Sequence, residues 1–375
     1  TIAGGSMAGF SNAAGIFASF SDPQGVCIDR SGNLYVADTG NNVVRRISPS
    51  GLVTTFAGSG INGSQLGAAT NAQFSGPTGV CVDNSGNVYV ADSGNCNRVC
   101  KVDTNGMVTV FANVTTCGPG IGNFASQLWQ LAIGPDSDIY IGYWAEVYQI
   151  TPNGVVKGLS GTGCNCPGGW GLNVGPGVDS QTNIYSATSA YVWKSDVSGA
   201  TEVFAGDGMG FSDGPRLLSG FYTAQDAAVD SASNIIVSDT IRIRKIHPDG
   251  WVSTVAGNGI SGYVNGCGPV AEFNNAAGLC VDTQGNIYIA DSGNNCIRKI
   301  SIVTAPPFLQ INLSTNQVVL SWPIWANDYT LEIANTLAEG PIWIPLTNGV
   351  TTSVNYFVLT NNIGTGPSFY RLYKP

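Results

Sequence analysis

The chain has 375 residues, of which 15 are Lys or Arg and 24 are Asp or Glu, and it carries a net charge of −9. Nucleic acids and anionic membranes bind proteins through a stripe of basic residues, which this acidic and sparsely charged chain lacks. We therefore expect neither as a partner. No run reaches the roughly 18 uninterrupted apolar residues that a membrane span needs. The 50 glycines indicate many tight turns and many short strands, which predicts an all-β fold.

A unit of four strand-like runs is repeated along residues 1–304. The clearest copy covers residues 25–58, and the same order of runs returns from Gly79 and from Gly278, with weaker copies between them. One residue after the first turn marks six copies, spaced 45 to 54 residues apart: Asn33, Asn87, Asp138, Asn183, Asn234 and Asn286. Four strands per copy predict a six-bladed β-propeller, because a single blade cannot bury both of its faces.

The strongest copies share a Gly-Val-Cys-Ile-Asp strand, an Asn-Leu-Tyr-Val-Ala-Asp strand and an Arg-containing third strand. This order resembles the NHL repeat, and the resemblance covers roughly residues 1–304. The resemblance implies a six-bladed propeller. It is specific in copies one, two and six and fair in copy five, whereas copies three and four keep only the strand rhythm. Within each first hairpin, Asp29, Asp83 and Asp282 are predicted to form the turn through side-chain bonds to nearby amides.

The first residues of the chain are expected to complete the last blade. Copy six ends near Ile300 without a fourth strand, and residues 1–4 match residues 55–58 and 254–257. In all three places the glycine precedes a phenylalanine by 16 residues (4 to 20, 58 to 74, 257 to 273). We therefore expect residues 1–5 to pair with blade six and close the ring.

A different pattern follows the proline linker at residues 305–307. Residues 308–375 contain five alternating runs, with Trp322 and Tyr329 available for a core, and this predicts a small β-sandwich. The module resembles the fibronectin-type-III-like (immunoglobulin-like) modules at the ends of secreted bacterial proteins. That resemblance implies a spacer, a surface anchor or an assembly contact.

Ten cysteines favour an oxidising compartment, and we expect a secreted or cell-surface chain whose signal peptide has been removed. Cys27, Cys81 and Cys280 share one position on the innermost strand, which predicts buried thiols. Six further cysteines are candidates for disulfide bonds: Cys96, Cys117, Cys164, Cys166, Cys267 and Cys296. Cys96 is expected to reach Cys117 and Cys267 to reach Cys296, while Cys164 and Cys166 form a local bridge or pair separately.

Aromatic residues gather in copies three and four, and five of them form the predicted ligand-binding set: Tyr143, Trp144, Tyr148, Trp170 and Trp193. Tyr148 and Trp193 stand where better copies carry Arg45 and Arg298. Exposed aromatic rings with few charges around them stack on sugars or anchor a protein partner. Packing between blades is the alternative interpretation.

No catalytic, metal-binding or cofactor motif is recognisable in the sequence. His247 is the single histidine, and it lies in an outer turn. Having one histidine argues against a three-histidine zinc site and against most Ser-His-Asp arrangements. The glycine-rich run at residues 206–214 predicts a flexible loop, with a cation cradle formed by Asp207 and Asp213 as the alternative. We predict no cofactor, no metal site and no catalytic residue.

These observations favour a non-catalytic extracellular interaction or structural protein. In its sharper form, the hypothesis is self-assembly into a surface fibre or layer through propeller and module contacts. The first alternative is a propeller that binds carbohydrate or protein, and the second is a metal-dependent lyase or lactonase-like enzyme. The expected partner is a protein, including a second copy of the chain, or a glycan.

Overall fold

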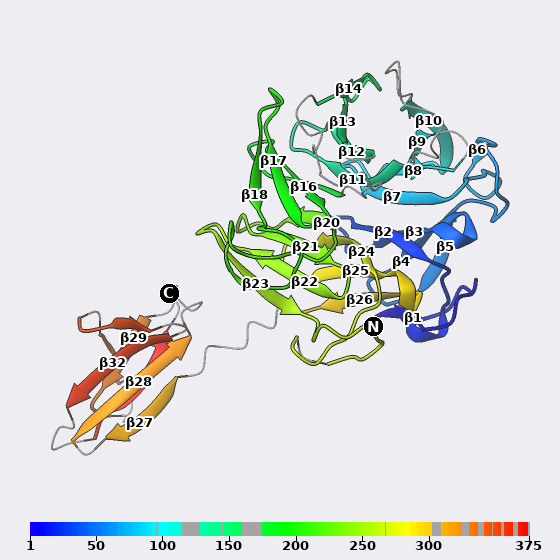
Figure 1. The fold of residues 1–375 in the computed structure, drawn as a ribbon. Helices are drawn as coiled ribbons and strands as arrows, with labels where there is room; N and C mark the ends of the chain where they lie inside the picture. The colour runs from blue at the N-terminus through cyan, green and yellow to red at the C-terminus, as the bar shows by residue number, and fades with distance from the viewer. Residues whose placement is uncertain are drawn as a thin grey trace. The chain divides into compact units, whose positions relative to one another are not determined.

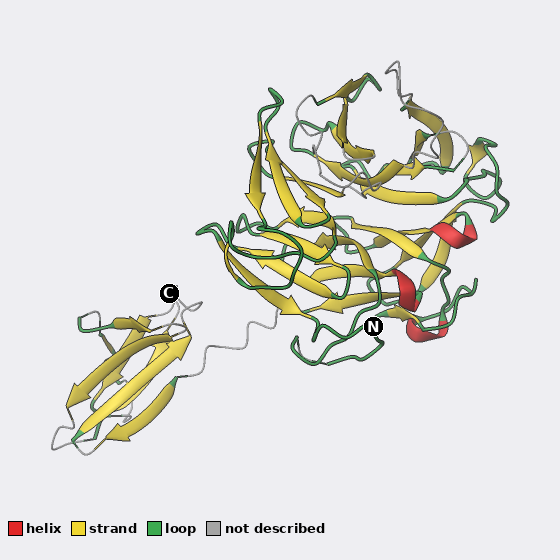
Figure 2. Ribbon diagram, viewed as in Figure 1, coloured by secondary structure: helices red, strands yellow, loops and turns green. Residues whose placement is uncertain are grey.

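The structure, a computed structural model, describes residues 1–94, 97–114, 128–143, 146–159, 175–266, 268–301, 309–314, 316–323, 330–336, 341–346, 348–353, 356–362 and 367–373. The chain divides into two compact units, Thr1–Ile302 and Val303–Pro375. Strands dominate the described residues, and the helices among them are three short 3-10 turns, η1 (Gly15–Phe17), η2 (Thr39–Asn41) and η3 (Ser292–Asn294) (Figure 2). In the part of the chain that is described, no helix is long and apolar enough to cross a bilayer.

The described residues of the first unit form six antiparallel sheets in chain order. Sheet one contains β2 (Pro23–Ile28), β3 (Leu34–Asp38), β4 (Val43–Ile47) and β5 (Val53–Ala57). Sheet two contains β7 (Pro77–Val82), β8 (Val88–Asp92), β9 (Arg98–Val102), β10 (Met107–Asn113) and the short β6 (Gly67–Ala68). Sheet three contains β11 (Leu128–Ile133), β12 (Ile139–Tyr143), β13 (Glu146–Ile150) and β14 (Val156–Gly158).

The remaining sheets repeat this order. Sheet four contains β15 (Gly175–Val178), β16 (Ile184–Thr188), β17 (Tyr191–Ser195) and β18 (Thr201–Ala205). Sheet five contains β20 (Ala224–Val229), β21 (Ile235–Asp239), β22 (Arg242–Ile246), β23 (Trp251–Ala256) and the short β19 (Gly214–Pro215). Sheet six contains β24 (Ala276–Val281), β25 (Ile287–Asp291), β26 (Cys296–Ile300) and, from the start of the chain, β1 (Ala3–Gly4).

The first strands of the six sheets contact one another in cyclic order. β2 contacts β7, β7 contacts β11, β11 contacts β15, β15 contacts β20, β20 contacts β24, and β24 contacts β2 (Figure 1). We call this cyclic set of sheets the ring. Its core lies between neighbouring sheets: Tyr35 and Val44 of sheet one, for example, share a buried cluster with Val80 and Val90 of sheet two. Strand alternation allows this, because each sheet presents one apolar face to each neighbour.

The predicted pairing of the chain's first residues with the last sheet is present. Ala3 lies opposite Ile297 and Gly4 opposite Cys296, so β1 forms the outer edge of sheet six (Figure 1). The backbone N–H of Ile2 also donates to the carbonyl of Ile297 at 2.9 Å. Residues almost 300 positions apart are therefore joined in one sheet.

The aspartates of the first hairpins form the turns, as predicted. One carboxylate oxygen of Asp29 accepts the backbone N–H groups of Ser31 and Asn33, and the other accepts the side-chain amide of Asn33 and the hydroxyl of Tyr35. Asp83 and Asp282 repeat this pattern. Their carboxylates are therefore engaged within their own hairpins.

The second unit contains two antiparallel sheets among its described residues. One has the order β27 (Gln310–Ser314), β28 (Gln317–Pro323), β32 (Tyr356–Asn362), β31 (Thr351–Ser353), and the other has the order β30 (Ile344–Pro345), β29 (Thr330–Ala334), β33 (Phe369–Tyr373). Side chains from both sheets share one buried cluster, which includes Leu320, Trp322 and Leu331. Tyr329 lies outside the described residues, and the resemblance to fibronectin-type-III modules stays a prediction.

Closure by β1 is testable with one pair of matched substitutions. Gly4 has φ +80°, and a Cβ atom there would lie 2.6 Å from the carbonyl oxygen of Asn295, whereas a Cβ on Gly5 would meet nothing within 4 Å. We expect Gly4→Ala to lower the free energy of unfolding by about 1–3 kcal/mol, through strain at a left-handed position. Gly5→Ala should change it by less than about 0.5 kcal/mol. Denaturant titration measures both, and equal stability of the two variants would contradict the role of β1.

Candidate functional site

Several predicted site residues lie outside the described part of the chain. These are Trp144 and Trp170 of the aromatic set and Cys96, Cys117, Cys164, Cys166 and Cys267 of the disulfide set. For Tyr143 the backbone, at the end of β12, is described. The Cys96–Cys117 bridge and the role of Cys164 and Cys166 therefore stay predictions.

Tyr148 and Trp193 are the two aromatic candidates whose side chains are described. They occupy the same register position on β13 and β17 that Arg45 occupies on β4, so the predicted equivalence is correct. Both side chains are half-buried, and Trp193 packs against Tyr191 with ring centroids 6.1 Å apart. A binding platform shared by the five predicted aromatics stays a prediction.

Cys296 requires a correction to the disulfide prediction. It is a buried free thiol at the start of β26, where it lies opposite Gly4 of β1. Burial raises the pKa of this thiol to about 12. The predicted bridge from Cys267 to Cys296 is therefore not formed in this structure, because the closing strand covers the position from which Cys296 would reach a loop.

Hydrogen bonds hold the glycine-rich loop around Asp213 in place. One oxygen of the Asp213 carboxylate accepts a hydrogen bond from Arg244 at 2.8 Å, and the other accepts the backbone N–H of Thr254 at 3.0 Å. The Asp213 carboxylate is thus engaged with the buried Arg244 guanidinium, and the cation-cradle alternative for Asp207 and Asp213 stays a prediction.

A cavity of about 220 Å³ lies at the centre of the ring, lined by residues of all six first strands. Cys27, Cys81 and Cys280 contribute to its wall as free thiols, which confirms the predicted position of these cysteines on the innermost strands. Pockets that hold drug-sized ligands usually measure about 300–1,000 Å³. This cavity is smaller, so it suits water or a very small ligand.

Two polar side chains reach into this cavity at the beginning of the first strands. Four first strands carry glycine at the position concerned (Gly25, Gly79, Gly175 and Gly278), whereas β11 carries Gln130 and β20 carries Asp226. The side-chain amide of Gln130 donates to the carbonyl of Gln24 at 2.9 Å, across the ring from sheet three to sheet one. The glycines leave room for these two side chains at the crowded centre.

Asp226 is a buried carboxyl whose hydrogen-bond donors are backbone amides. Its oxygens accept the N–H groups of Leu279, at 2.8 Å, and of Ala227, at 3.0 Å. Desolvation by burial raises the pKa of Asp226 to about 8, and the two amides act in the opposite direction. The carboxyl therefore holds a proton at neutral pH and links sheet five to sheet six.

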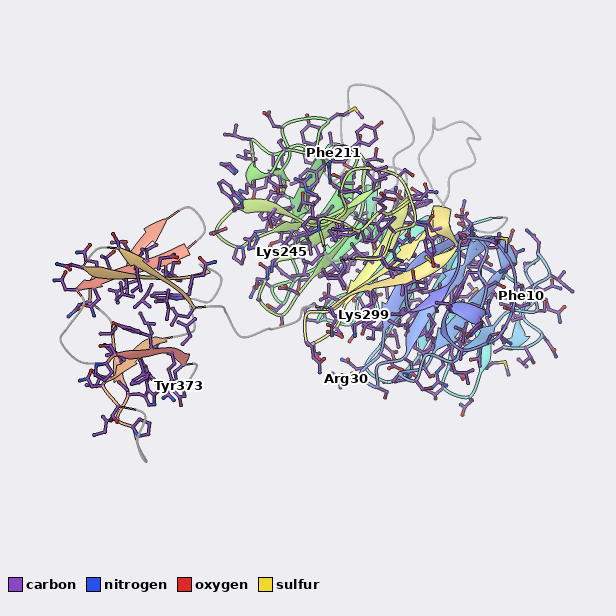
Figure 3. The ribbon with its side chains drawn as sticks, turned by 90° about the horizontal axis from the view of Figure 1, so that it is seen from below. Phe10, Arg30, Phe211, Lys245, Lys299 and Tyr373 are labelled. Atoms are coloured by element: carbon purple, nitrogen blue, oxygen red, sulfur yellow. The ribbon has the colours of Figure 1, made fainter. Side chains whose placement is uncertain are left out.

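Four connections between sheets display an exposed apolar side chain shortly after the fourth strand. Met7, Ile61, Met209 and Ile260, which we call the tip residues, each lie three residues after the glycine that ends a fourth strand, and their exposed fractions are 82%, 61%, 69% and 62%. The four connections are consecutive around the ring, since they precede sheets five, six, one and two. Phe10 and Phe211, labelled in Figure 3, belong to two of them.

Backbone hydrogen bonds hold each tip against its own sheet. A glycine shortly after the tip donates its N–H to the carbonyl of a buried phenylalanine, and the pairs are Gly9 with Phe20, Gly63 with Phe74, Gly210 with Phe221 and Gly262 with Phe273. The donor–acceptor distances run from 2.8 to 3.2 Å. The tips are therefore parts of ordered loops, and the loop before sheet five is one residue shorter, so Met209 lies directly before its bonded glycine.

A buried ion pair anchors the connection before sheet one. Arg45 on β4 bonds to Asp38 at 2.9 Å, and both side chains are fully buried. The same guanidinium donates to the carbonyls of Ser11 and Ser19, at 2.7 and 3.0 Å. Asp38 in turn accepts the backbone N–H of Ser21 at 2.8 Å. The pair thus ties three points of the connection to the sheet.

The other three connections are anchored in the same way, by the pairs Asp92–Arg98, Asp239–Arg244 and Asp291–Arg298. Arg244 donates to the carbonyls of Ser212 and Gly220, and Arg298 donates to those of Val264 and Glu272. Arg98 differs in register from the other three arginines, because it lies directly opposite its paired aspartate, Asp92. Its guanidinium still reaches the carbonyls of Ser64 and Gln73 in the connection before sheet two.

The four connections differ in charge, because those at residues 206–221 and 257–273 contain Asp207, Asp213, Arg216 and Glu272. The connections at residues 4–20 and 58–74 contain no Asp, Glu, Lys or Arg. Further exposed apolar side chains stand on the same connections, including Phe10, Ile16, Phe17 and Leu218. An exposed apolar surface of this kind marks an interaction site more often than a solvated face.

The sequence-based search missed the tip residues and Asp226. The signal for the tips was present, because each follows an Ala-Gly pair by three residues and is Met or Ile in all four copies. The signal for Asp226 was the loss of glycine at one position of copy five. Neither position stood out without the register of the strands.

The buried Asp226 carboxyl predicts a specific pH dependence of stability. Its pKa is about 8 in the folded chain and close to the ordinary value of 3.8 in the unfolded chain, so the folded state holds the proton more tightly. The free energy of unfolding should therefore fall as pH rises through this interval, by at most about 1.4 kcal/mol per pH unit. Asp226→Asn should remove this term and flatten the slope between pH 5 and pH 8, an interval of about three units. Chemical denaturation of both proteins across this range measures the slopes, and parallel slopes would contradict the assignment.

Comparison with known proteins gives three matches to the NHL repeat, at residues 20–47, 74–97 and 273–300. Similar curated proteins include Teneurin-3 of Mus musculus, 26% identical over 356 residues that cover 81% of this chain and 12% of that protein. Protein SUPPRESSOR OF QUENCHING 1, chloroplastic, of Arabidopsis thaliana is 25% identical over 314 residues, 78% of this chain and 26% of that protein. The chain thus spans between about a tenth and about a quarter of the length of these curated relatives.

Solved structures share the fold at low sequence identity. A Bacteroides thetaiotaomicron protein of unknown function matches with a TM-score of 0.66 and 20% identity, covering 80% of this chain and 74% of that one. An auxiliary nutrient binding protein from the same species matches with a TM-score of 0.61 and 16% identity, covering 80% and 75%. The chain therefore contains NHL repeats and has an all-β, propeller-like fold.

Proposed function

We propose that this chain is a non-catalytic extracellular interaction protein, which binds a partner protein through the four tip residues. In this proposal the ring is a six-bladed β-propeller closed by its N-terminal strand, and a small β-sandwich follows it. The cyclic contacts of the first strands and the pairing of β1 with β26 support the propeller. The core shared by the two sheets of the second unit supports the sandwich.

One observation carries the binding proposal: the repeated, anchored display of Met7, Ile61, Met209 and Ile260. Leaving four large apolar side chains in water is unfavourable, and burying each one would contribute about 1.5–3 kcal/mol. The anchoring pairs fix the loops before any partner arrives, so less conformational entropy is lost on binding. Methionine side chains also adapt to irregular apolar surfaces, which suits a protein interface.

The chemistry of the tips favours a protein over a glycan. Sugar rings stack on aromatic faces, whereas all four tips are aliphatic or thioether side chains. Of the aromatic set on which the carbohydrate alternative rests, Tyr148 and Trp193 are half-buried in sheets three and four. The extracellular location in this proposal is supported by the ten cysteines of the sequence.

The chemistry of the described residues supports the non-catalytic part of the proposal. The imidazole of His247 shares a hydrogen bond with the hydroxyl of Ser253 at 3.0 Å, and burial lowers its pKa. Burial raises the pKa of the Cys27 thiol well above its ordinary value, which makes it a poor nucleophile. Among the residues that the structure describes, no three His, Cys, Asp or Glu side chains are grouped as metal ligands. The lyase or lactonase alternative has no supporting site there.

Site-specific photocrosslinking tests the proposed face. A benzoylphenylalanine placed at Met209 of the full chain should form discrete adducts with one protein in extracellular material of the producing organism. The matched control is Val197, an exposed apolar residue in a turn at the other end of sheet four. We expect the adduct only from position 209, and adducts of equal yield from both positions would contradict the proposal.

Charge substitution gives a second, quantitative test with the captured protein as the probe. The variant Met7→Glu, Ile61→Glu, Met209→Glu and Ile260→Glu should weaken binding by about a hundredfold or more, because four desolvated charges would face an apolar partner. The control places glutamate at Leu52, Met107, Val155 and Val197, which are exposed at the start of the fourth strands or in the segments that lead into them. Binding that survives the tip variant, or that requires a glycan on the captured protein, would overturn the assignment.

A further inference from the structure

The edge strand β27 of the second unit leaves core-facing side chains uncovered. It is the outermost strand of its four-stranded sheet, and all five of its residues are exposed. Ile311 lies opposite Leu320 and Leu313 lies opposite Val318. Directly opposite residues project from the same face of a sheet, so Ile311 and Leu313 share the face that buries Leu320 and Val318.

The two side chains are nevertheless open to solvent. Ile311 is 53% exposed and Leu313 is 78% exposed, whereas Leu320 is fully buried. The core-facing side of this sheet is therefore covered at β28 and uncovered at β27. The apolar face at β27, which no other described residues cover, can pack against another apolar face.

The backbone edge of β27 is also unprotected. Natural sheets discourage pairing at their edges with lysines, prolines or bulges. The sequence Gln-Ile-Asn-Leu-Ser of β27 contains none of these residues, and its pairing with β28 runs without a register shift. One row of backbone groups on β27 is thus available to a further antiparallel strand.

The strand is complementary to itself. If two copies of β27 pair antiparallel about a two-fold axis at Asn312, Ile311 of each copy lies opposite Leu313 of the other, and Gln310 lies opposite Ser314. The apolar side chains then meet on one face and the polar ones on the other. A slip of one residue would mix the two faces, and of the registers that keep them apart only the one centred on Asn312 pairs all five residues of the strand. The uncharged edge also brings no like charges together at the axis.

We propose that β27 pairs with β27 of a second copy of this chain, joining their four-stranded sheets into one continuous sheet with two-fold symmetry. The contact is isologous and closes at a dimer. It involves only the second unit, so it stands or falls independently of the partner proposed for the ring.

Mass measurement of the full chain tests this pairing. Light scattering coupled to size-exclusion chromatography should give twice the chain mass at micromolar concentration. Leu313→Lys places a charge against the second copy's Ile311 and should weaken dimerisation by roughly tenfold or more. The matched control is Ile342→Lys, since Ile342 is 79% exposed in the same unit but precedes β30 on the other sheet.

The control should remain dimeric, and all three proteins should keep the same circular dichroism spectrum, which shows that the fold is intact. A monomeric wild-type chain, a dimer that survives Leu313→Lys, or loss of the dimer in Ile342→Lys would each overturn the proposal. Open-ended polymers that persist in Leu313→Lys would do so as well.

A crosslink tests the register. Asn312→Cys places two thiols on the two-fold axis, where opposite Cα atoms would lie about 4.5–5.5 Å apart, within reach of a disulfide. Mild oxidation should convert this variant to a covalent dimer on a non-reducing gel. Gln310→Cys, whose opposite residue is Ser314, should yield at least about tenfold less, as should the unmodified chain under the same conditions. Equal yields would contradict the two-fold register.

Discussion

A buried carboxylate–guanidinium pair between the second and third strands organises the ring. The arginine of each pair reaches back into the connection that precedes its sheet, and the aspartate accepts an amide at the end of that connection. A buried ion pair adds little net stability compared with apolar residues of the same size, but removing one partner costs about 3–5 kcal/mol. Its contribution is therefore to fix one loop path among many. Sheets three and four, where Tyr148 and Trp193 replace the arginine, have also lost the aspartate, since a lone buried charge would be costly.

Because the loops are fixed by hydrogen bonds, their apolar side chains stay exposed and do not fold back onto the ring. Each tip residue stands between a glycine that leaves the fourth strand and a glycine that bonds back to a buried phenylalanine. The centre of the ring leaves less room for a ligand, because Gln130 and the protonated Asp226 reach into its small cavity. The pairs that define the repeat thus also fix the loops that display the tip residues.

Sequence reasoning predicted what depends on local pattern. Turn aspartates such as Asp29, the strand order and the pairing of residues 1–5 with the last sheet all follow from short motifs with regular spacing. The tips escaped because Met7 and Ile61 look like ordinary loop residues until their exposure is known. Cys296 was assigned to a loop bridge because the sequence does not reveal that β1 covers it. Asp213 was considered as a cation ligand because its ion pair joins residues 31 positions apart.

The central claim is that the connections are ordered before a partner binds, and hydrogen exchange of the native chain tests it most directly. The amides of Gly9, Gly63, Gly210 and Gly262 should exchange far more slowly than in an unstructured peptide, because each is bonded to a buried phenylalanine carbonyl. Replacing Arg244 by Met should release protection across residues 206–221 and leave residues 4–20 protected. Exchange at peptide rates in the native chain would show that the tips are not held in place and would contradict the account.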